Sequence, residues 1–103
     1  MKNEIDDDIW VLQTLRLVQA LLGTVSENFR MVGLAHDGNL WKLIFILAED
    51  RSEDREEIDD VAVEFEALQE KSIRYEVEVS VTKEPITWPS QSVRIVYRRR
   101  EAL

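Results

Sequence analysis

The chain has 103 residues, the usual size of one domain, and 45% of them are hydrophobic, so we expect a single domain, residues 1–103, around one core. It carries a formal net charge of -8 at pH 7. It has no cysteine, which excludes disulfides, thiolate catalysis and cysteine-ligated zinc. Residues 1–8 lack the basic start of a signal peptide, and no apolar run is long enough to span a membrane. We therefore expect a cytoplasmic protein.

Residues 4–22 predict the first helix. Apolar residues recur there every three or four positions, and the aspartates at 6–8 lie in the first turn, where the helix dipole favours acids. Gly23 follows as a signal for the end of the helix. The periodic apolar residues are Ile5, Ile9, Leu12, Leu15, Val18 and Leu22.

Residues 29–35 and 40–47 predict two strands of a hairpin, because Asp37-Gly38 between apolar runs is the strongest short hairpin signal. A loop of these two residues pairs His36 with Asn39, and a three-residue loop would shift this register. In both cases each face is apolar, so we expect the hairpin to be central in the sheet or covered by a partner on its second face. With the two-residue loop, one face carries Val32, Leu34, Trp41, Leu43 and Phe45, and the other carries Phe29, Met31, Ala35, Ile44 and Ile46.

A second helix is predicted from about residue 50 to about residue 71. Asp50 and Ser52 compete as its N-cap, and Glu53 follows Asp50 at the spacing of a capping box. Its outer side is dense in acids. Its expected core stripe is Ile58, Val61, Ala62, Phe65 and Leu68.

Two further strands complete the chain. Residues 73–82 alternate apolar with polar and predict a strand with one buried face, and residues 93–98 resume alternation after a loop with Pro85 and Pro89. The order α-β-β-α-β-β predicts an α+β two-layer sandwich, with two helices packed on one face of a four-stranded, mainly antiparallel sheet. The second and third strands are expected to pair in parallel through the second helix.

No catalytic constellation is evident. His36, the only histidine, lies beside Asp37 at the predicted hairpin tip, where water is poorly excluded, so we favour a turn residue over a pH switch or a contact. The glycines match no phosphate-binding loop, and the carboxylates at 6–8 and 50–54 do not follow the calcium-loop pattern. We therefore expect no enzyme, no catalytic residue, no metal and no cofactor. A carboxylate enzyme would need a water-shielded pocket.

The strongest signal is charge segregation. Residues 49–66 hold ten acids against only Arg51 and Arg55 as bases. Such a segment steers a basic partner, and the alternative is a solvated helix face. As partner-binding residues we predict the outer face of the second helix, with Trp88 as an accessory contact. The predicted helix residues are Asp54, Glu56, Glu57, Asp60 and Glu64.

A basic patch near the end of the chain superficially suggests nucleic-acid contact. Its arginines must compete with 21 acids, so we expect no nucleic-acid partner and no membrane partner. The patch is expected to pair with the acidic helix or to protect the sheet edge. Trp41 is expected in the core, with an anchoring role in an interface as the alternative. The patch consists of Arg94, Arg98, Arg99 and Arg100.

The layout, the acidic second helix and the ending Val96-Tyr97-Arg98-Arg99-Arg100-Glu101 after a Pro-bearing hairpin resemble small bacterial immunity proteins of contact-dependent inhibition and related polymorphic toxin systems. The resemblance implies a cytoplasmic antidote that binds and blocks a cognate toxin domain, often a nuclease. Our hypothesis is therefore a protein-binding module that neutralises a basic, nuclease-type toxin. The alternative is a homodimeric structural or regulatory protein, paired through the second apolar face of the first hairpin.

Overall fold

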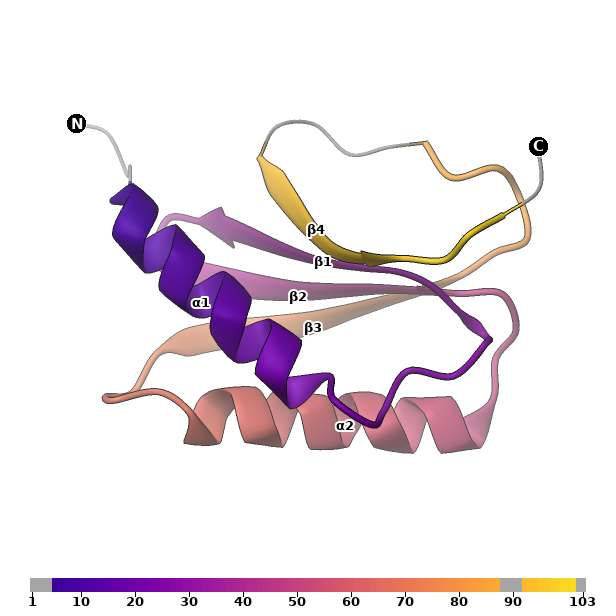
Figure 1. Cartoon of the computed structure of the whole chain (residues 1–103), viewed down its shortest axis with the longest axis horizontal. Helices are drawn as coiled ribbons and strands as arrows, with labels where there is room; N and C mark the ends of the chain where they lie inside the picture. Colours follow the sequence, from indigo (N-terminus) through magenta and orange to yellow (C-terminus); the bar gives the residue numbers. More distant parts are fainter. Residues whose placement is uncertain (1–4, 88–91, 102–103) are drawn as a thin grey trace.

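The computed structural model describes residues 5–87 and 92–101 and shows two helices and a mixed four-stranded sheet (Figure 1). The sheet order is β3-β2-β1-β4, with β1 antiparallel to both of its neighbours and β2 parallel to β3. The predicted α+β order and the parallel contact are confirmed. The elements are α1 (Asp7–Ala20), β1 (Phe29–Asp37), β2 (Leu40–Leu47), α2 (Ser52–Ala67), β3 (Arg74–Val81) and β4 (Val93–Arg98).

The hairpin loop lies one residue later than predicted. Asp37 pairs with Leu40 and His36 with Trp41, so that the loop is Gly38-Asn39. Gly38 has φ +63°, a left-handed conformation that glycine adopts without strain. The change moves each pairing partner by two residues, and an even shift does not by itself move a side chain to the other face.

The start of β1 contains a bulge that was not predicted from the sequence. Phe29 pairs with Leu47 and Met31 with Ile46, so that Arg30 is an extra residue in the strand. The extra residue reverses the alternation, and Phe29 lies on the core face rather than beside Met31 on the second face. Its ring meets that of Phe45 edge to face at a centroid distance of 6.2 Å.

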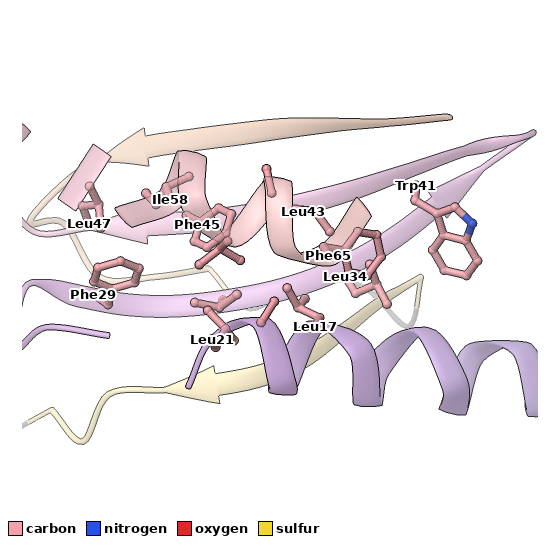
Figure 2. Packing of buried hydrophobic residues seen from close by; sticks show 14 residues of the cluster. Leu17, Leu21, Phe29, Leu34, Trp41, Leu43, Phe45, Leu47, Ile58 and Phe65 are labelled. Atoms are coloured by element: carbon pink, nitrogen blue, oxygen red, sulfur yellow. The ribbon is translucent and has the colours of Figure 1, made fainter. Parts of the chain in front are cut away.

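The core lies between the sheet and the two helices (Figure 2). Trp41 is buried at one end of it, as predicted. From α2, four of the five predicted core residues are buried, while Leu68 is half-buried beyond the end of the helix. The buried cluster contains Leu17, Ala20, Leu21, Phe29, Val32, Leu34, Trp41, Leu43, Phe45, Leu47, Ile58, Val61, Ala62 and Phe65.

Helix α1 buries a different side from the one marked by its apolar period. Its buried residues are Gln13, Leu17 and Ala20. The amide of Gln13 exchanges two hydrogen bonds with that of Gln69, at 2.8 and 2.9 Å, which allows a polar group to be buried without loss. Of the six residues whose spacing predicts the helix, only Ile5 packs against the core, and the other five are exposed.

Candidate functional site

Helix α2 presents an acidic outer surface. Glu56, Asp60 and Glu64 are exposed, as expected for the outer face of the helix, whereas Glu57 is half-buried. Within the described residues, no ion pair joins these four carboxylates to a cation. Four acids at helical spacings of four, three and four residues share one side of α2 and are named here the acidic stripe. They are Glu53, Glu57, Asp60 and Glu64.

Asp54 does not belong to this surface, contrary to prediction. Its side chain is buried and accepts hydrogen bonds of 2.8 Å from Ser26 Oγ and from Asn28 Nδ2. Asn28 also joins both backbone groups of Glu49, at 2.7 and 2.9 Å. Since α2 begins at Ser52, Asp54 lies in its first turn, and its side chain faces the segment before β1. Its role is to hold α2 against the start of β1.

The cations around the start of α2 bind acids that precede the acidic stripe in the chain. Arg55 Nε lies 2.6 Å from an Asp50 oxygen, and Arg51 lies 3.3 Å from Glu27. These hydrogen bonds raise the pKa of both guanidinium groups. Lys83 likewise lies 3.4 Å from a Glu49 oxygen, and this contact is the main cause of a lowered Glu49 pKa. The local cations therefore leave the acidic stripe uncompensated.

Three rings form a cluster at the hairpin end of the core. The centroid of His36 lies 4.5 Å from that of Trp41, and Trp10 meets Trp41 edge to face at 5.2 Å. His36 is therefore a half-buried strand residue, not the turn residue that the sequence predicted. Burial lowers its pKa, against the opposing charge of Asp37. Trp10 was missed as a core contact because it falls between two members of the apolar period.

Two arginines of the basic end, Arg94 and Arg99, bind partners other than the acidic helix, contrary to one of our expectations. Arg94 lies 3.9 Å from Asp7 and 4.8 Å from the ring centroid of Trp10. Arg99 lies 3.0 Å from Glu101. Both belong to β4 or its end, and β4 is an edge strand, so these charges do lie at a sheet edge as the alternative predicted.

Two further predictions concern Trp88 and the carboxylates considered for a calcium site. Trp88, the expected accessory contact, lies outside the described residues. Of the carboxylates considered for calcium, Asp50 is bound to Arg55 and Asp54 faces inward. Among residues 5–87 and 92–101 no cluster of three metal-ligating side chains occurs, and neither helix there is long and apolar enough to cross a membrane.

The second feature of the helix layer is apolar. Between positions 9 and 22, α1 and its end have only four polar residues before Gly23, and one of these is the buried Gln13. Leu15 is 59% exposed and Leu22 is 73% exposed. We name the exposed set the apolar stripe, a surface whose spacing in the sequence predicted a helix and no binding site. It consists of Ile9, Val11, Leu12, Leu15, Val18 and Leu22.

Comparison with known proteins adds one match. A family model described as MafI2 immunity protein matches residues 8–101, from the first turn of α1 to beyond the end of β4. A comparison with curated proteins finds no match. Because the family model covers nearly the whole chain, the chain belongs to the MafI2 immunity protein family.

Proposed function

We propose that this chain is the antidote of a toxin-immunity pair, which binds a cognate toxin domain and blocks its activity. Membership of the MafI2 immunity protein family, over residues 8–101, carries the proposal. Under this proposal the chain acts by occupying a surface of the toxin, and no side chain is assigned a catalytic role. Its partner is therefore a protein.

The charge distribution supports a basic toxin, of which a nuclease is one kind. Glu56, Glu57, Asp60 and Glu64 lie on α2 with no ion-pair partner among the described residues. A nuclease must attract a polyanionic substrate and therefore presents cations around its site. Complementary charge speeds the encounter of two proteins and suppresses wrong partners. An acidic helix would compete for the surface that the nucleic acid uses.

Homodimerisation is the second candidate, and the second face of the sheet favours it. Ile44 and Ile46 are half-buried there and Ile95 is exposed. Both described helices pack on the opposite face. A second copy could cover this surface without preventing toxin binding by the helix layer.

A rescue experiment tests the antidote proposal. A candidate toxin domain from a neighbouring gene is expressed from an inducible promoter in a bacterial host, with this chain, with an unrelated acidic immunity protein or with an empty vector. We expect this chain alone to restore colony counts by several orders of magnitude. Purified chain should also bind a catalytically inactive form of the toxin in calorimetry. Absence of both rescue and binding would contradict the proposal.

A further inference from the structure

Helix α1 has an outer side that is unusual for a helix facing water. A surface helix normally places charged and polar residues outward, and a helix that is apolar nearly all round is covered by something. Here the apolar stripe includes Leu15 and Leu22, more than half exposed, while the inward side already packs Leu17 and Leu21 against the sheet. The apolar stripe is therefore additional to what the core of this chain requires.

We propose that the apolar stripe of α1 is the anchor on which the toxin domain docks, and that the acidic stripe of α2 is its charged rim. This inference rests on the proposed function and deepens it, because it assigns the binding surface. Interfaces commonly consist of an apolar centre and a polar rim, and the centre supplies most of the affinity. The expected toxin surface is an apolar patch flanked by lysine or arginine.

The two stripes belong to one continuous layer. α1 and α2 lie on the same face of the sheet and contact each other (Figure 1). At one end Gln13 and Arg16 both donate to Gln69, which follows α2, at 2.8 and 3.0 Å, and Arg16 lies 3.7 Å from Glu70. One partner domain can therefore contact the apolar stripe and the acidic stripe together.

Charge decides between this occupant and the others. An isologous contact through α1 would bring together two chains of net charge -8, each with its acidic stripe in the same layer. A membrane surface is also a poor match, since helices that lie on anionic lipid carry lysine and arginine on their polar side. Arg16 is the only cation of α1, and it is already joined to Gln69 and Glu70. A basic protein partner complements what remains.

The test replaces leucines of the apolar stripe by glutamine, which leaves the net charge unchanged and, at Leu15 within α1, the helix propensity nearly unchanged. We compare L15Q/L22Q with the control V81Q/I95Q, which alters two residues of 40% and 39% exposure on the strands. Each variant is measured by surface plasmon resonance against the inactive toxin domain. We expect Kd for L15Q/L22Q to rise by about thirtyfold or more, through faster dissociation with little change in the association rate. The control should bind like the native chain.

The outcomes separate the surface from the function. If the native chain rescues growth and L15Q/L22Q binds with native affinity, the inferred surface is wrong while the proposed function stands. If only V81Q/I95Q weakens binding, the toxin uses the second face or edge of the sheet. If the native chain neither rescues nor binds, both are overturned. A dimer in light scattering that L15Q/L22Q abolishes would assign the apolar stripe to a second copy. Unchanged circular dichroism and Tm show that each variant is folded.

Discussion

The side-chain amide of Asn28 donates a 2.8 Å hydrogen bond to the carboxylate of Asp54 and so joins the start of β1 to the first turn of α2. Both side chains are buried. The second carboxylate oxygen accepts from Ser26, and the Asn28 amide also binds both backbone groups of Glu49. This cluster fixes the connection between β2 and α2. Every polar side-chain atom in it has a hydrogen-bond partner, so that no buried polar group is left unsatisfied.

Replacing Asp54 with alanine should therefore destabilise the fold and leave the binding surface intact. The change removes two buried hydrogen bonds, and we expect unfolding to become easier by about 1–3 kcal/mol. Urea unfolding followed by circular dichroism measures this. Asp60→Ala, an exposed residue of the same helix, is the matched control and should change stability by less than about 0.5 kcal/mol. An unchanged midpoint for Asp54→Ala, with slower association of the toxin, would restore Asp54 to the interface.

Arg30 and Glu101 give the stability of the fold a dependence on acid pH. The buried Arg30 donates two hydrogen bonds to Glu101, at 2.8 and 2.9 Å, and two more to the carbonyls of Thr82 and Glu84. The Arg30 hydrogen bond is the main reason that the Glu101 pKa is lowered from 4.5 to about 2. Because the folded pKa lies below the unfolded one, this pair stabilises the fold fully above about pH 4.5 and loses that contribution as pH falls toward 2.

Glu101→Gln tests this pH dependence. We expect the variant to be less stable than the native chain at pH 7, and the difference to shrink between pH 4.5 and pH 2. Chemical unfolding at pH 7, 4 and 3 measures it. Glu84→Gln is the control, since Glu84 contributes its backbone carbonyl to Arg30. A difference that is constant with pH would show that the lost contribution is not the charge of Glu101.

His36 should resist protonation. Its pKa is lowered from 6.5 chiefly by burial beside Trp41, and the charge of Asp37 opposes the shift. Because the unfolded chain binds the proton more readily than the folded chain, this residue lowers stability as pH falls below about 6.5. As the only histidine, its ring resonance can be followed by NMR without assignment. A titration midpoint below 6.5 is expected in the folded chain, and a midpoint at or above 6.5 would contradict the burial argument.

Charge reversal on α2 should lower the rate of association with the toxin. E56K/D60K and the control E76K/E84K each change four units, from -8 to -4, but only the first alters the outer surface of α2. We expect E56K/D60K to slow association and to flatten its dependence on salt, with little effect on dissociation. Stopped-flow association at 50 and 300 mM salt is the measurement. Equal slowing by both pairs would indicate a response to net charge alone.

The elements and their order could be predicted from the sequence, because each segment has a clear period and distinct end signals. The alternation in 73–82 and the core stripe from Ile58 to Phe65 both correspond to observed structure. The predicted hairpin loop was displaced by one residue, since Asp37-Gly38 and Gly38-Asn39 both suit a turn. The sequence does not show whether Gly38 takes the first or the second position of the loop, and the structure places it first. Phe29 was assigned to the wrong face, since the residues next to it in the sequence give no signal for a bulge.

The surface was harder to predict than the fold. α1 is apolar on nearly every side, so its period shows that it is helical without showing which side is buried. In the sequence Asp54 cannot be distinguished from the other acids of α2. Its hydrogen bonds with Ser26 and Asn28 in the structure show that it faces inward. Such a contact between distant segments has no local signal. The acidic surface itself could be predicted because charge segregation is a property of the sequence alone.

The position of β4 has a consequence for how the chain folds. Ile95 pairs with Gly33, 62 positions earlier, whereas Leu34 pairs with Leu43 only nine positions away. Pairings between distant residues form late, because the entropy of closing a long loop is lost before the new contacts stabilise the chain. Until β4 arrives, β1 has one open edge of nine mainly apolar residues, and an open strand edge is a site for aggregation. Solubility during synthesis therefore depends on how quickly the last strand joins the sheet.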